Sequence, residues 1–144
     1  MTEPRAHPVF AQGGTTVFEV FSALARETGA INLGQGFPDH GEPEEVIAAA
    51  AAALHEKSNQ YPPMMGIPEL RSAVADHARR FYGLDIDAAR EVMVTSGATE
   101  ALSAAILTFV RPGDEVVTFE PMYDSYAPMI RRAGGIVRTL RLAA

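Results

Sequence analysis

The sequence contains no cysteine and only one lysine among its 144 residues. The absence of cysteine excludes stabilising disulfides and thiolate catalysis, and it favours a reducing compartment, which we take to be the cytoplasm. The single lysine, Lys57, follows an alanine-rich segment that is expected to be helical. A cation at the end of a helix complements the helix dipole and extends into water, so we expect no catalytic role for Lys57.

Positive charge and long apolar runs are also scarce. Twelve basic residues stand against eighteen acidic ones, for a net charge of −6, and no polybasic patch is present. This balance argues against nucleic acid and anionic membranes as partners. The longest apolar run, Val46 to Leu54, is too short to span a bilayer, and the beginning of the chain, Met1 to Arg5, has no apolar signal region. The sequence therefore supports neither a secreted nor a membrane protein.

Helix signals dominate the first half of the chain, where capping residues and glycine stops bracket segments of helical periodicity. The expected elements are a helix capped by Thr15 or Thr16 and ended by Gly29, a short extended piece from Ile31 to Leu33, a helix opened by Pro43, and a helix from Pro68 to about Tyr82 stopped by Gly83.

From residue 91 the pattern changes to alternating strands and helices. Strands are expected at Glu91 to Thr95, Glu115 to Phe119 and Ile136 to Leu142, separated by helices at about 98–110 and 125–133. A βαβαβ order of this kind predicts an α/β fold. The helix at 98–110 is apolar almost all round, so it needs cover on more than one side. Asp124 is best interpreted as the N-cap of the helix that follows it, rather than as an acid catalyst.

The segment VTSGATEA, residues 94–101, runs from a strand through a glycine turn into a helix. The first N–H groups of a helix have no intrahelical acceptor, and the helix dipole adds about half a positive charge there, so the junction can bind a phosphate group. We call residues 96–99 the anion cup. Gly97 allows close approach of the backbone, while Ser96 and Thr99 offer hydroxyl donors. The alternative is an ordinary turn in which Ser96 or Thr99 only caps the helix.

Three further motifs accompany the anion cup in a recognisable order. They are INLGQGFPD at 31–39, NQYPP at 59–63 with Gly66 following, and EPMYDSY at 120–126. Together they resemble the N-terminal part of the class I and II aminotransferases, the fold-type-I enzymes that use pyridoxal 5′-phosphate. The likeness covers nearly all of residues 15 to 142 and is closest to the kynurenine, methionine and succinyldiaminopimelate aminotransferase branch.

The resemblance implies a domain organisation. Residues 1–30 would form an N-terminal arm and helix, and residues 31–144 the first part of the large cofactor-binding domain, a three-layer α/β/α structure that is incomplete here. In the family's seven-stranded sheet, the first strand lies at one edge while the second and third lie toward the other. The later strands that fill the space between them, and the C-terminal part of the small domain, are not in this sequence.

The resemblance also implies roles for individual residues. Gly97, Ala98 and Thr99 would bind the cofactor phosphate, Tyr123 would stack on the pyridine ring, and Tyr61 would cross a dimer interface to the partner subunit's phosphate. The backbone N–H of Gly36 would meet the substrate carboxylate, and Phe18 would wall the substrate pocket, where several relatives carry tryptophan. Judged from the residues alone, Gly36 would be an ordinary turn glycine and Phe18 a core residue. Tyr123 would be a half-buried loop tyrosine, and Tyr61 would pack on Pro62 and Pro63.

No catalytic residue is expected in this chain. The family's Schiff-base lysine, its remaining cofactor contacts and its substrate-binding arginine correspond to positions beyond residue 144. We therefore expect the N-terminal segment of a cytoplasmic, homodimeric enzyme that transfers an amino group between an amino acid and a 2-oxo acid, with the segment alone inactive. The alternatives are a cysteine-conjugate β-lyase of the same fold and a non-catalytic fragment that needs a second chain.

Other chemistries fit less well. The glycines at 34 and 36 lack the third glycine of a dinucleotide fingerprint, and Pro38 stands where a helix would begin. The four histidines are not spaced as metal ligands on one helix face, so no metal site is expected. A hydrolase nucleophile elbow, Gly-x-Ser-x-Gly, is also missing.

Overall fold

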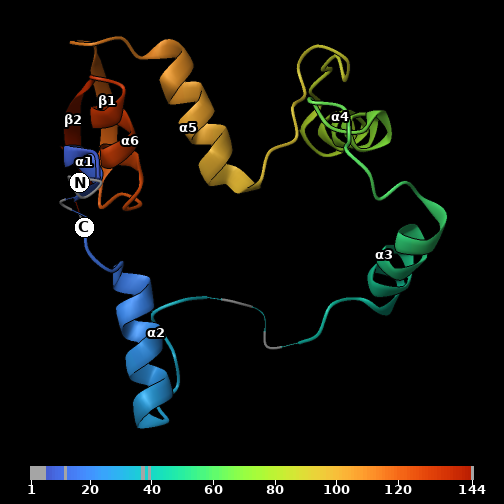
Figure 1. Cartoon of the computed structure of the whole chain (residues 1–144), viewed down its shortest axis with the longest axis horizontal. Helices are drawn as coiled ribbons and strands as arrows, with labels where there is room; N and C mark the ends of the chain where they lie inside the picture. The colour runs from blue at the N-terminus through green and yellow to red at the C-terminus, as the bar shows by residue number, and fades with distance from the viewer. Residues whose placement is uncertain (1–5, 12, 37, 39, 144) are drawn as a thin grey trace, which may run out of the picture. The chain divides into compact units, whose positions relative to one another are not determined.

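A computed structural model describes residues 6–11, 13–36, 38 and 40–143 of the chain (Figure 1). The N-terminal segment Met1 to Arg5, and Phe37 and Asp39 of the INLGQGFPD motif, lie outside the described residues. The contacts divide the chain into two compact units. The first unit combines residues 1–36 with 96–144, and the second comprises residues 37–95. Each unit is described by itself.

The first unit begins with two helices, α1 (Pro8–Ala11) and α2 (Val17–Thr28). The side chain of Thr16 caps α2, because its hydroxyl oxygen accepts the N–H of Glu19 at 3.2 Å. Gly29 ends α2 in the left-handed region, with φ 67°. Both boundaries confirm the sequence prediction. Residues 31–33 form no strand, and the side chains of Ile31 and Leu33 are 86% and 91% exposed.

The remainder of the first unit alternates helices and strands. The elements are α5 (Gly97–Phe109), β1 (Glu115–Glu120), α6 (Tyr126–Arg132) and β2 (Ile136–Arg141). The strands pair in parallel, from Glu115 opposite Ile136 to Glu120 opposite Arg141. A parallel pair joined by a helix is a βαβ unit, so this part of the chain is α/β as predicted. Within it Ile130 of α6 is 1% exposed and forms the most buried point.

The second unit contains α3 (Glu44–Glu56) and α4 (Pro68–Tyr82). Both helices begin where the prolines predicted, and Gly83 ends α4 with φ 68°. Ala75 and Ala78 of α4 are buried together with Val92. Two hydrogen bonds fasten the segment around Val92: Arg71 Nε donates to the Val92 carbonyl at 3.0 Å, and the Val94 N–H donates to the Met65 carbonyl at 3.1 Å.

Two predictions were wrong. Residues Glu91 to Thr95 do not form a strand. A strand requires a neighbouring strand to pair with, and the sheet found in the described part of the chain consists of β1 and β2 paired with each other. Asp124 is not the N-cap of α6. The helix begins one residue later, after Ser125, because a backbone bond from Tyr126 N–H to the Tyr123 carbonyl at 3.2 Å first closes a turn.

Among the described residues, none of the helices has the length and apolar character that crossing a membrane requires.

Candidate functional site

The anion cup lies at the start of α5. Gly97, the first residue of the helix, has φ 83°, a left-handed conformation that side chains rarely adopt. A Cβ atom built on Gly97 would meet no heavy atom within 4 Å. The backbone conformation, rather than a shortage of space within the protein, therefore requires glycine here. Ser96 makes no side-chain capping bond to α5, so the capping alternative does not hold for this serine.

A neighbouring acidic residue takes part in the anion cup. The carboxylate of Glu100 accepts the backbone N–H of Ser96, which joins the first turn of α5 to the turn before it. A negative charge in the first helical turn is stabilised by the helix dipole. The bond also means that an anion bound at this helix end would rely on the N–H groups that follow, at Ala98 and Thr99. Glu100 is not among the predicted site residues, although a glutamate in the first turn after a glycine junction is a recognisable signal.

Tyr123 follows the carboxyl end of β1 and is 45% exposed. Its ring centroid lies 6.0 Å from that of Phe18 and 5.7 Å from that of Tyr126, the latter in an edge-to-face arrangement. A groove of about 520 Å³ places Tyr123 together with Leu102 and Ile106 of α5. Leu102 is less than one helical turn beyond Thr99, so Tyr123 lies along the helix that begins with the anion cup.

Three predicted site residues are brought together. Phe18, Gly36 and Tyr123 line one cavity of about 520 Å³, which we call the Phe18–Tyr123 cavity. Its other lining residues are Thr16, Glu19, Gly34 and Gln35. Gly36 is not among the described glycines with positive φ, and a Cβ built there would meet no heavy atom within 4 Å. Neither backbone conformation nor internal packing therefore accounts for glycine at this position.

The other predicted residues lie elsewhere. Gly97, Ala98 and Thr99 do not line the Phe18–Tyr123 cavity. Tyr61 belongs to the second unit, where its side chain is 98% exposed. This exposure is incompatible with the alternative in which Tyr61 simply packs on Pro62 and Pro63. Lys57 ends α3 with an exposed side chain, as the sequence indicated.

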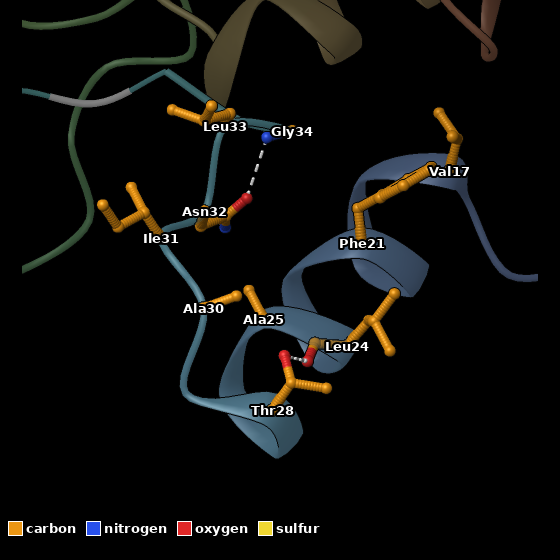
Figure 2. Close-up of a pocket in the computed structure, with 10 residues that line it drawn as sticks. All are labelled: Val17, Phe21, Leu24, Ala25, Thr28, Ala30, Ile31, Asn32, Leu33 and Gly34. Atoms are coloured by element: carbon orange, nitrogen blue, oxygen red, sulfur yellow. Dashed lines mark hydrogen bonds between the residues drawn. The ribbon is translucent and has the colours of Figure 1, made fainter.

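A polar network of Ser22, Asn32 and Gln35, which was not predicted from the sequence, adjoins this cavity. Ser22 of α2 is 8% exposed, and its hydroxyl oxygen accepts a hydrogen bond from Asn32 Nδ2 at 3.1 Å while its proton is donated to Gln35 Oε1 at 3.3 Å. Asn32 Oδ1 in turn accepts the Gly34 N–H at 3.0 Å, as Figure 2 shows. Ser22 on an otherwise apolar face of the helix was the sequence signal for this network, because buried hydroxyl groups almost always have a hydrogen-bond partner.

Close packing also holds this turn against α2. A Cβ atom on Gly34 would lie 2.9 Å from Cβ of Phe21, so only glycine allows the chain to approach the helix this closely. The segment at 30–34 and α2 together border an apolar groove of about 550 Å³ (Figure 2). The position of the turn that carries Gln35 and Gly36 is therefore set by α2 on one side and by the Asn32 side chain on the other.

Comparison with known sequences gives one consistent result. The aminotransferase class I and II family matches residues 28–144. The chain is 50% identical over 131 residues to the methionine aminotransferase of Escherichia coli (strain K12), covering 91% of this chain and 34% of that protein. It is also 50% identical over 134 residues to a probable N-succinyldiaminopimelate aminotransferase of Mycobacterium tuberculosis, covering 93% of this chain and 33% of that protein.

Solved structures agree. The Escherichia coli methionine aminotransferase superimposes with a TM-score of 0.88 and 47% identity, covering 97% of this chain and 37% of that one. The N-succinyldiaminopimelate aminotransferase of Mycobacterium tuberculosis gives 0.89 and 46%, covering 97% and 36%. The chain thus spans about a third of the length of the curated relatives it matches. It belongs to the class I and II aminotransferases, and it carries the N-terminal portion of their fold-type-I α/β architecture.

Proposed function

We propose that the intact protein containing this chain transfers an amino group between an amino acid and a 2-oxo acid with the help of pyridoxal 5′-phosphate. One observation carries the proposal: Phe18, Gly36 and Tyr123, assigned to the substrate and cofactor sites by resemblance, line the same cavity although they are far apart in the sequence. The family match supplies the class of reaction.

The residues present fit the cofactor. Gly97 has the left-handed conformation with which the chain enters the first turn of α5, and a Cβ atom built on it would contact no residue beyond its chain neighbours and its own helix within 4 Å. Tyr123 is 45% exposed and lines a groove with Leu102 and Ile106 of the same helix, so its ring is accessible to an aromatic ligand. We propose that Gly97, Ala98 and Thr99 bind the phosphate and that Tyr123 stacks on the pyridine ring.

When bound, the cofactor would supply the electron sink that stabilises negative charge at the substrate's α-carbon. The chain's own residues have other tasks. The Gly36 N–H would donate to the substrate carboxylate, which fixes the substrate's orientation, and the absence of a side chain leaves this N–H approachable. Phe18, with its ring next to that of Tyr123, would form an apolar wall of the same cavity.

We further propose the arrangement that the resemblance implies, in which residues 31–144 begin the cofactor-binding domain, residues 1–30 form the arm and helix, and two subunits form a homodimer. The 98% exposure of Tyr61 supports this, because an aromatic side chain directed into water is suited to reach a neighbouring subunit. Its partner would be the cofactor phosphate of the other subunit. A cytoplasmic location stays a prediction from composition.

The test is an assay of the intact protein with pyridoxal 5′-phosphate, methionine and 2-oxoglutarate. We expect glutamate and the 2-oxo acid of methionine in equal amounts. A cysteine conjugate is supplied in parallel, and release of pyruvate and thiol without glutamate would identify a β-lyase instead. Cofactor binding without either reaction, across a panel of amino donors, would overturn the proposed function and favour a non-catalytic product.

A further inference from the structure

Which atoms donate and which accept in the hydrogen bonds around Ser22 is determined by one backbone group, the N–H of Gly34. The Gly34 N–H can only donate, so the Asn32 atom that it meets must be the carbonyl oxygen Oδ1. Asn32 therefore presents its amino group, Nδ2, to Ser22 Oγ. The hydroxyl of Ser22 has a single proton, and it goes to Gln35 Oε1. The chain of donors runs from Asn32 through Ser22 to Gln35.

This direction decides which end of the Gln35 amide faces the cavity. Because Oε1 accepts the Ser22 hydroxyl, Nε2 lies at the other end of the planar amide with two N–H donors. Gln35 is exposed and lines the Phe18–Tyr123 cavity next to Gly36. Ser22 is 8% exposed, and its partners in this network are Asn32 and Gln35, so the link between them is sheltered from water.

We propose that Gln35 is a substrate-binding residue, whose Nε2 donates to the substrate carboxylate beside the Gly36 N–H, and that Ser22 and Asn32 are positioning residues that orient it. This inference rests on the proposed function. Two neighbouring donors, one from the backbone and one from a side chain, match the two oxygen atoms of a carboxylate. Gly34 contributes by its close approach to Phe21, which keeps the turn against α2.

The first experiment removes the donor. In the intact protein, Gln35→Met keeps the length of the side chain without its amide, and we expect the KM for methionine to rise about tenfold, the lower end for a hydrogen bond to a charged group because the site is partly exposed. The kcat should stay within about threefold, since the contact is made equally before and during the reaction. Gln35→Glu should raise KM further, because it places a negative charge against the carboxylate.

The second experiment reverses the network without changing its shape. In Asn32→Asp, one carboxylate oxygen still accepts the Gly34 N–H, but the other replaces the amino group and must accept the Ser22 proton. Ser22 then accepts from Gln35 Nε2, and Oε1 turns toward the cavity. We expect KM to rise at least as much as in Gln35→Met. When Ser22→Ala is already present, the same Asn32→Asp change should raise KM by less than threefold, because Asn32 then no longer acts on Gln35 through the Ser22 hydroxyl.

Two inhibitors identify the substrate group that Gln35 contacts. The deaminated analogue of methionine keeps the carboxylate, and its inhibition constant should rise with the KM in every variant. The decarboxylated analogue lacks that group, and its inhibition constant should not change. If the affinity of a variant for both inhibitors falls equally, or if kcat and cofactor affinity fall together, the role of Gln35 is merely structural and the inference is overturned.

The outcomes separate the two proposals. An active wild-type protein whose KM is unchanged in Gln35→Met and Asn32→Asp would overturn this inference alone. A wild-type protein without amino transfer would overturn the proposed function and this inference with it. Should Ser22→Ala fail to fold, judged by thermal unfolding, Gln35→Met still decides the matter because Gln35 is at the surface.

Discussion

Replacing Gly97 by valine tests the anion cup directly. With φ 83° at Gly97, a side chain in this left-handed region costs about 1–2 kcal/mol, and more for a β-branched residue. The turn will therefore relax and move the N–H groups of Ala98 and Thr99, with a further loss of about 1 kcal/mol for a weakened hydrogen bond to phosphate. Together these changes should weaken cofactor binding by about 2–3 kcal/mol, or about 30- to 160-fold in Kd. A Cβ atom at this position would contact no other part of the chain within 4 Å, so the backbone conformation rather than a clash of the Cβ is the expected cause.

Gly83 provides a matched control. It has φ 68°, and a Cβ there would also meet nothing within 4 Å, but it ends α4 and lies outside the proposed site. Gly83→Val should lower the free energy of unfolding of the intact protein about as much as Gly97→Val does. Titration with pyridoxal 5′-phosphate, followed by absorbance, should show reduced affinity only for Gly97→Val. Equal affinity of this variant and the wild type would remove the anion cup as the phosphate site.

Three further outcomes are expected. Tyr123→Ala should weaken cofactor binding by about 1–2 kcal/mol through loss of a stacking face, while Tyr123→Phe retains it; the same titration checks this. Residues 1–144 alone, incubated with cofactor, amino donors and 2-oxoglutarate, should form no glutamate, and turnover that survives Lys57→Ala would contradict the absence of a catalytic residue. The same chain should associate or unfold without cooperativity; a monomer by sedimentation, with a sharp thermal transition and protected amides at 92–95, would show that it has a self-sufficient fold.

Helix boundaries were predictable because their causes are local. Thr16 caps α2 through a bond to a residue three positions away, and Gly29 and Gly83 end their helices through their own backbone conformation. Pro68 likewise begins α4 through its fixed φ. Each signal is complete within one helical turn, so it can be interpreted without knowledge of the tertiary structure.

The failed strand shows the opposite case. Residues 91–95 have the β-branched pattern of a strand, yet the hydrogen bonds that would make them one must come from another strand. Here the segment is held instead by Arg71 and by the Met65 carbonyl. Gly66 packs against it so closely that an added Cβ would lie 2.5 Å from a methyl carbon of Val94. A pattern of side chains predicts which residues suit a strand, whereas pairing decides whether a strand forms.

The candidate site was predictable to the extent that family motifs carry it. Phe18, Gly36 and Tyr123 were assigned by resemblance, and the cavity that they share is consistent with those assignments. The network around Ser22 was not predicted, because it joins residues ten and thirteen positions apart through side-chain geometry. Only a folded structure shows that the donor direction set at Gly34 reaches Gln35.

The sheet offers a physical reason to regard this chain as part of a larger domain. In α/β proteins a parallel sheet is covered by helices on both faces, and its strands are buried on both sides. In the described residues, Val117 and Phe119 of β1 are 62% and 60% exposed, and α5, although apolar almost all round, contains no buried residue. Apolar surface of this kind is stabilised only when other elements cover it. The relatives are about three times as long, and elements from such additional chain could provide this cover. We therefore expect the exposed apolar residues of β1 and α5 to become core wherever the chain is part of a domain of that length.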